Sequence, residues 1–296
     1  MSIGSIVPLA NRQYLSIGGI TLGIAMPCGH SLRLQPDHEM FRVDDSPCDI
    51  EITVEQVDDL PPVGAEVLFD SGGLWALQSD GTDMVFDFKT PLAGPEPYKR
   101  MITNTSFSKA RLLVRDFGQG EIDPLEYPAD ELLALHWLSQ GRGIEVHGCG
   151  IIDSIAGGQL FIGHSGAGKS TTTRLWNSTR EVVVLSDDRI ILRRHPHGLR
   201  MYGTPWHGEC GLAAPQSADI SRVFVLEHGT ENKITSLSQS KAVAEIFARS
   251  FVPFHDREAL DRTLCYLQQL TKAVPCYRFQ FVPDSDAVQT VLEFHD

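Results

Sequence analysis

The hydrophobic pattern of the first 125 residues predicts strands. Short apolar segments, some of them strictly alternating, are interrupted by turn formers such as Asp80-Gly81, which is typical of a β-hairpin. The predicted strands cover residues 51–57, residues 109–117 and three segments within 65–90. We therefore predict a β-rich N-terminal domain over residues 1–125. No pattern within this domain indicates a catalytic or binding site.

From about Pro124 the pattern changes. Residues 127–143 combine Pro128, early acidic residues, an apolar run and Gly141, which predicts a helix. Apolar segments with the length of strands then alternate with helical segments. Strands are predicted at 143–153, 157–163, 181–194 and 276–283, and helices after residue 168 and at 238–251 and 256–274. This order predicts a C-terminal α/β domain over residues 126–296.

Charge and cysteine content exclude several functional classes. The chain has 296 residues, 42% of them hydrophobic, and a net charge of −13, so we expect neither a nucleic acid nor a membrane as partner. No apolar run is long enough to span a bilayer, and the first residues lack the pattern of a secretory signal. The six cysteines form no C-x-x-C pair, which predicts reduced, mostly buried thiols. These features predict a cytoplasmic protein.

The segment GHSGAGKST, residues 163–171, matches the phosphate-loop pattern G-x-x-x-x-G-K-[ST] between a predicted strand and a predicted helix. In such a loop the backbone N–H groups surround a phosphate, the lysine contacts the outer phosphates and the next hydroxyl binds Mg²⁺. We therefore predict that the protein binds ATP and Mg²⁺. Lys169 would contact the outer phosphates, and the hydroxyl of Ser170 would bind Mg²⁺. The predicted nucleotide-binding residues are Gly163, His164, Ser165, Gly166, Ala167, Gly168, Lys169, Ser170 and Thr171.

The helix after this loop has a low intrinsic propensity. Thr171, Thr172 and Thr173 are β-branched and lose side-chain freedom in a helix. A phosphate bound at the helix N-terminus would offset this cost, because it meets unpaired N–H groups and the positive end of the helix dipole. The alternative interpretation is a glycine-rich turn between a strand and a helix, without a ligand.

Two adjacent acids follow the next apolar strand, in the segment VVVLSDD. One carboxylate at this place binds Mg²⁺ in proteins with a phosphate loop, and a second can accept the proton of an attacking hydroxyl. We therefore predict that Asp187 and Asp188 divide these two roles. The alternative is a helix cap or a turn in which neither side chain takes part in chemistry.

Four further side chains are close to these motifs in the sequence. His147 comes shortly before the strand that leads into the phosphate loop, although a single histidine is often structural. The glycine-rich segment 203–211 contains Glu209, a candidate metal ligand, and His207, a candidate phosphate or substrate contact. Arg189 follows the acidic pair, and we favour a solvated surface role for it.

The order of these motifs resembles the catalytic core of bacterial HPr kinase/phosphorylase. The shared features are a His-Gly pair, the loop GHSGAGKST and the segment LSDDRI, all within residues 144–215. That core has the fold of phosphoenolpyruvate carboxykinase, and some related proteins phosphorylate serine in peptide precursors such as lasso peptides. The resemblance implies a P-loop kinase core of this type, catalytic roles for His147 and Lys169, and a homo-oligomer. It also implies that Asp188 accepts the proton and Asp187 binds the metal.

We expect an ATP- and Mg²⁺-dependent phosphotransferase that moves the γ-phosphate to a hydroxyl. We favour a serine of a protein or peptide as the acceptor, but the segment GTPWHGE departs from the signature of the family, so HPr itself is not indicated. A kinase for a small-molecule hydroxyl is the second hypothesis. The third is a nucleotide-binding regulatory switch without transfer activity, and carboxykinase-like chemistry is the last. The acidic pair favours transfer over a switch, because a switch needs only one metal-binding acid.

Overall fold

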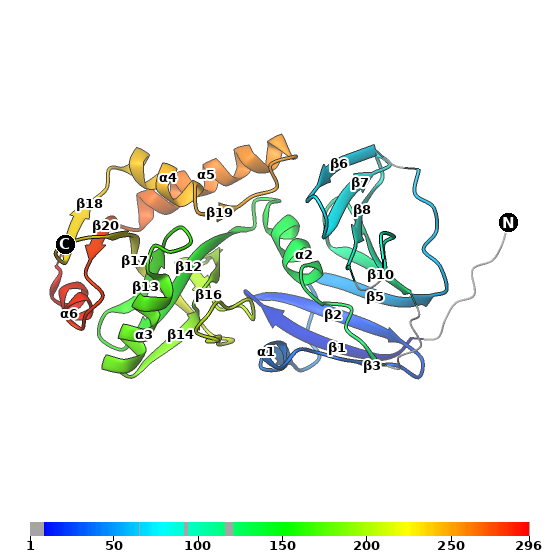
Figure 1. The fold of residues 1–296 in the computed structure, drawn as a ribbon, viewed down its shortest axis with the longest axis horizontal. Coiled ribbons are helices and arrows are strands. Elements are labelled where there is room, and N and C mark those ends of the chain that lie inside the picture. The colour runs from blue at the N-terminus through cyan, green and yellow to red at the C-terminus, as the bar shows by residue number, and fades with distance from the viewer. Residues whose placement is uncertain (1–8, 65, 92–93, 116–120, 296) are drawn as a thin grey trace. The chain divides into compact units, whose positions relative to one another are not determined.

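The structure is a computed structural model that describes residues 9–64, 66–91, 94–115 and 121–295, which form two compact units (Figure 1). Unit 1 extends to Trp137, except that Ile17–Gly19 belong to unit 2 together with the chain from Leu138 onward. The sequence pattern places this division at residue 125. The difference arises because the helix that begins at residue 129 packs on the sheet of unit 1.

Unit 1 contains a nine-stranded mixed sheet in the order β4-β1-β2-β5-β10-β9-β8-β7-β6. Its strands are β1 (Leu9–Ile17), β2 (Ile20–Pro27), β4 (Arg42–Val43), β5 (Ile50–Val57), β6 (Glu66–Asp70), β7 (Trp75–Ser79), β8 (Asp83–Phe88), β9 (Lys99–Asn104) and β10 (Lys109–Arg115). The strands predicted within 51–57 and 65–90 are confirmed, and Asp80-Gly81 lies in the turn between β7 and β8. The last two residues of the strand predicted at 109–117 lie outside the described residues.

The remaining elements among the described residues of unit 1 are a short strand pair and two helices. They are β3 (Ser31–Leu32), β11 (Glu121–Ile122), α1 (Pro36–Glu39) and α2 (Ala129–Leu138). The ring of His136 on α2 lies 5.0 Å from the rings of both Phe86 and Phe107. The helix predicted after Pro124 is therefore confirmed, and its contacts assign it to the β-rich unit.

Unit 2 contains a second nine-stranded mixed sheet in the order β13-β12-β15-β16-β17-β20-β18, with β14 and β19 paired to β12 and β13 also paired to β17. Its strands are β12 (Gly143–Asp153), β13 (Gly157–Ile162), β14 (Val182–Ser186), β15 (Arg189–His195), β16 (Gly198–Tyr202), β17 (Ser217–His228), β18 (Lys233–Ser236), β19 (Ser250–Phe251) and β20 (Cys276–Phe281). Its helices are α3 (Lys169–Thr179), α4 (Gln239–Phe247), α5 (Arg257–Ala273) and α6 (Asp286–Glu293). The unit is mixed α/β. The prediction that strands and helices alternate regularly is wrong for β14–β18, because these strands follow one another without a helix between them.

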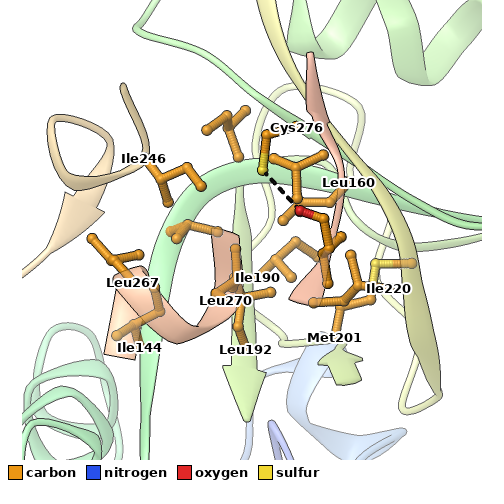
Figure 2. Close-up of a cluster of buried hydrophobic side chains, with 14 of the residues drawn as sticks. Ile144, Leu160, Ile190, Leu192, Met201, Ile220, Ile246, Leu267, Leu270 and Cys276 are labelled. Carbon is orange, nitrogen blue, oxygen red and sulfur yellow. Dashed lines mark hydrogen bonds between the residues drawn. The ribbon is translucent and has the colours of Figure 1, made fainter. Parts of the chain in front are cut away.

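Three parallel neighbours, β13, β17 and β20, are buried on both faces in unit 2. On one face, Leu160 and Leu270 belong to a cluster in which α4 and α5 pack against the sheet (Figure 2). On the other face, Phe161 packs in a second cluster with Trp176 of α3 and Val288 of α6. Burial on both faces explains the apolar segments 160–162 in β13 and 223–226 in β17. The carboxyl ends of all three strands lie at the same edge of the sheet, where the phosphate loop begins.

No helix within the described ranges is long and apolar enough to cross a membrane. None of the six cysteines forms a disulfide, but the expectation that most are buried is wrong: Cys28 and Cys265 are exposed, and of the six only Cys149 and Cys276 are buried.

Candidate functional site

The segment 163–168 forms a tight loop between β13 and α3. Gly166 and Gly168 have φ angles of 79° and 101°, in the left-handed region that favours glycine. A Cβ atom on Gly168 would lie 2.4 Å from the ring of Phe281, and one on Gly163 would lie 2.7 Å from Cβ of Ala167. Backbone conformation and close packing therefore both require the glycines of the motif.

Lys169 is the first residue of α3 and lies under the loop. Its Nζ donates hydrogen bonds to the carbonyl oxygens of Gly163 (3.2 Å) and His164 (3.3 Å), and the residue is only 6% exposed. Burial lowers the pKa of Lys169 below its ordinary value. An ammonium group in this position gains electrostatic energy when an anion such as a phosphate approaches, because the anion replaces the lost hydration.

The loop opens into a cleft of about 290 Å³. Most of the predicted site residues line this cleft, namely His147, Ser165, Gly166, Gly168, Lys169, Ser170, Thr171, Asp188 and Glu209. Gly163, His164, Ala167 and Asp187 are not among its lining residues. The structure thus brings together the loop, the lysine and one acid of the pair.

His147 and Asp188 form a direct pair in the cleft. Nε2 of His147 lies 2.8 Å from Oδ1 of Asp188, and the guanidinium of Arg189 contacts the other carboxylate oxygen. Burial acts to raise the pKa of Asp188, but the hydrogen bond from His147 and the charge of Arg189 outweigh it and hold this pKa below its ordinary value. Asp188 is therefore a carboxylate at neutral pH.

Arg189 belongs to this site, so the expectation of a solvated surface arginine is wrong. Its side chain is 19% exposed, its Nε lies 3.4 Å from Oε1 of Glu145, and its guanidinium lies 4.2 Å from the ring centre of Phe251. These partners come from β12 and β19, which are distant from Arg189 in the sequence. The arginine and His147 thus hold the two different oxygens of the Asp188 carboxylate.

Asp187 has a different environment from its neighbour. It is 1% exposed, and its carboxylate accepts hydrogen bonds from the backbone N–H groups of Gly208 (2.8 Å) and Cys210 (2.9 Å). The hydroxyl of Ser186 donates to the carbonyl oxygen of Trp206 at 3.1 Å. Asp187 therefore holds the glycine-rich segment 203–211 against the end of β14, while Asp188 faces the cleft.

The described residues of the cleft offer few protein ligands for a metal ion. Within the described residues, no group of three or more His, Cys, Asp or Glu side chains is placed to hold a metal. Magnesium with a nucleotide needs only one or two protein ligands, because phosphate oxygens and water supply the others. Ser170 and Asp188 line the cleft and offer a hydroxyl and a carboxylate. Glu209 lies at its rim, where the side chain is 84% exposed and 3.8 Å from Arg174.

Two residues of the cleft are not predicted by the sequence patterns above. Arg174 is four residues after Ser170, and this spacing places both side chains on one face of α3. The helical spacing could therefore have indicated Arg174 as a residue of the site. His228 ends β17, a strand that those patterns do not include, and its Nε2 lies 2.7 Å from the carbonyl oxygen of Gly166. His207, in contrast, is not among the lining residues, and its Nδ1 lies 3.0 Å from the carbonyl oxygen of Gly208.

No protein-family model matches this chain, and no curated protein matches it significantly.

Proposed function

We propose that this chain is an ATP- and Mg²⁺-dependent phosphotransferase, with a P-loop kinase core of the HPr kinase and phosphoenolpyruvate carboxykinase type. The observation that supports this most directly is the convergence of three parts on one cleft: the phosphate loop, Lys169, and Asp188 with its partner His147. A glycine-rich turn without a ligand would need neither a buried lysine nor an ionised acid facing it.

Phosphoryl transfer requires positioning and charge neutralisation more than covalent chemistry by the protein. The loop N–H groups and Lys169 hold and neutralise the β- and γ-phosphates of the nucleotide. Ser170 would hold Mg²⁺ together with those phosphates, and the bound ion would neutralise the charge that develops on them. Asp187, for which the resemblance implies the metal-binding role, has both carboxylate oxygens bonded to backbone N–H groups.

In this proposal Asp188 is the general base. In the reaction, the acceptor hydroxyl oxygen forms a bond to the γ-phosphorus, the bond to the bridging oxygen breaks, and the hydroxyl proton moves to the carboxylate of Asp188. His147 and Arg189 fix the orientation of that carboxylate through its two oxygens. Their positive or partly positive groups also favour its ionised form before the reaction.

The acceptor we propose is a serine hydroxyl of a protein or peptide. The rim of the cleft supports this choice, because Arg174 and Glu209 are both exposed there and offer one charge of each sign to an approaching chain. A small-molecule hydroxyl is the second candidate. Assays with peptide acceptors and with small hydroxyl compounds distinguish the two candidates.

The test compares the wild-type protein with Lys169→Ala and Ser170→Ala. We expect MgATP binding, measured by isothermal titration calorimetry, to fall at least about tenfold in Lys169→Ala, which corresponds to ~1.4 kcal/mol. In Ser170→Ala, Mg²⁺ should enhance nucleotide binding less than it does in the wild type. Unchanged affinity in Lys169→Ala would show that the loop is only a turn.

Activity is measured as transfer of labelled phosphate from ATP to serine-containing peptides, with EDTA as the metal-free control. Transfer that EDTA abolishes supports the kinase. Nucleotide binding without transfer to peptides or small hydroxyl compounds would favour the regulatory switch instead.

A further inference from the structure

His228 lies at the carboxyl edge of the sheet in unit 2. It is the last residue of β17, which runs parallel to β13 and pairs with it as far as Val225 opposite Ile162. In α/β sheets, ligands bind beyond the carboxyl ends of parallel strands. His228 therefore extends from β17 beside the phosphate loop, which extends from β13 in the same direction.

Two contacts fix the imidazole of His228. Its Nε2 donates a hydrogen bond to the carbonyl oxygen of Gly166 at 2.7 Å. Its ring stacks on Phe281, the last residue of β20, with ring centres 6.2 Å apart and planes inclined by 25°. Phe281 is itself 1% exposed and packs against Gly168. The orientation of the ring is thus determined by the loop on one side and by the sheet core on the other.

His228 is exposed and lines the cleft, and Phe281 is the one aromatic ring that stacks on it among the described residues. Among the residues that line the cleft, the only other ring belongs to His147, which is bonded to Asp188. His228 is therefore the one aromatic ring of the cleft lining that is not bonded to an acid.

We propose that the imidazole of His228 is the stacking platform for the base of the bound nucleotide. This inference rests on the proposed function, because it requires the triphosphate to lie in the phosphate loop. Asp188 is fixed by β12 and its own neighbour Arg189, whereas His228 is fixed on the loop itself through Gly166. In the sheet, β12 and β14 lie on one side of β13, and β17 lies on the other. Asp188, which follows β14, and His228, which ends β17, therefore flank the phosphate loop from opposite sides, and a nucleotide with its γ-phosphate toward Asp188 has its base toward His228.

A ring that is fixed before binding is well suited to this role. Stacking on aromatic rings stabilises bases of any sequence, because every base has a flat π-surface. The side chain loses little conformational entropy on binding, since Gly166 and Phe281 already hold it. The platform therefore contributes affinity for nucleotides over phosphate compounds without a base.

The experiment measures the affinities of ATP and of inorganic tripolyphosphate, each with Mg²⁺, for the wild type, His228→Ala and His228→Phe. We expect His228→Ala to bind ATP about tenfold more weakly and tripolyphosphate as tightly as the wild type does. His228→Phe loses the hydrogen bond to Gly166 but keeps a flat ring, so its affinity for ATP should stay within about threefold of the wild-type value.

Equal losses for both ligands in His228→Ala would overturn the proposal, because they would show that the histidine only supports the loop. Unchanged ATP affinity in His228→Ala, or an equal loss in His228→Phe, would also overturn it. If the wild type binds neither compound, the proposed nucleotide site fails and this inference fails with it. Binding of tripolyphosphate by His228→Ala shows that the variant is folded, so failure of the stacking role is distinguishable from failure of the site.

Discussion

Nε2 of His147 and Oδ1 of Asp188 are 2.8 Å apart, although the two residues are separated by 41 positions in the chain. This hydrogen bond places an ionised carboxylate of fixed orientation at the phosphate loop. We predict that Asp188→Asn lowers turnover by about a hundredfold or more, because an amide cannot accept the hydroxyl proton. Measurement of phosphate transfer in the steady state, with MgATP affinity measured in parallel, tests this prediction.

A matched control for Asp188→Asn is Asp219→Asn. Asp219 also pairs with an arginine, Arg200, at 3.0 Å, but it is exposed and does not line the cleft. The control should keep full turnover. Full turnover in Asp188→Asn itself would contradict the role of Asp188 as the base.

Asp187→Asn should instead reduce stability. The asparagine amide would place an N–H donor against the backbone N–H of Gly208 or Cys210, both of which now donate to Asp187. Loss of such a bond with one donor left unsatisfied costs about 1–3 kcal/mol in the free energy of unfolding. Urea unfolding of both Asn variants tests this, and a smaller loss in Asp187→Asn than in Asp188→Asn would be contrary to our assignment.

Nucleotide affinity should decrease at a lower pH than the pH at which a lysine with the ordinary pKa loses its charge. Burial lowers the pKa of Lys169, and phosphate binding requires its protonated form. As the pH rises through the lowered pKa of the free protein, the charge is lost and ATP binds more weakly. Titrations with ATP from neutral pH to about pH 10 measure this effect, since the ordinary lysine pKa is ~10.4.

The control for this titration is Lys169→Arg, because a guanidinium keeps its charge over the whole range. If this variant binds ATP, its affinity should not decline in the same way. An identical decline in both proteins would assign the pH dependence to another group.

Gly168→Ala should destabilise the protein more than Gly166→Ala does. Both residues have a positive φ, which costs an alanine about 1–2 kcal/mol. A Cβ atom on Gly168 would also meet the ring of Phe281, whereas nothing lies within 4 Å of one on Gly166. Thermal unfolding of the two variants compares these costs, and equal effects would mean that Phe281 can move away.

The local parts of the site could be predicted from the sequence because local rules determine them. The glycines, Lys169 and Ser170 follow one another in a single turn, so their spacing alone indicates the loop. The strand before the loop is apolar because both of its faces are buried, and this too is visible in the sequence.

Properties that depend on distant partners could not be predicted in this way. Arg189 has the sequence environment of a surface residue, and its burial depends on Glu145 and Phe251 from other strands. His228 contacts the loop only because β17 pairs in parallel with β13. The helical pattern at residues 127–143 was sufficient to predict α2 but carries no information about which sheet the helix covers.

The contact between Phe281 and Gly168 has a consequence for how the chain is made. A ribosome adds Gly168 long before Phe281, so the phosphate loop leaves the ribosome without the ring that packs against it. Its final packing must wait until β20 has been synthesised and has paired with β17. Nascent chains that end before residue 276 therefore carry the complete motif but not the supported loop, and full nucleotide affinity should develop only after β20 has emerged.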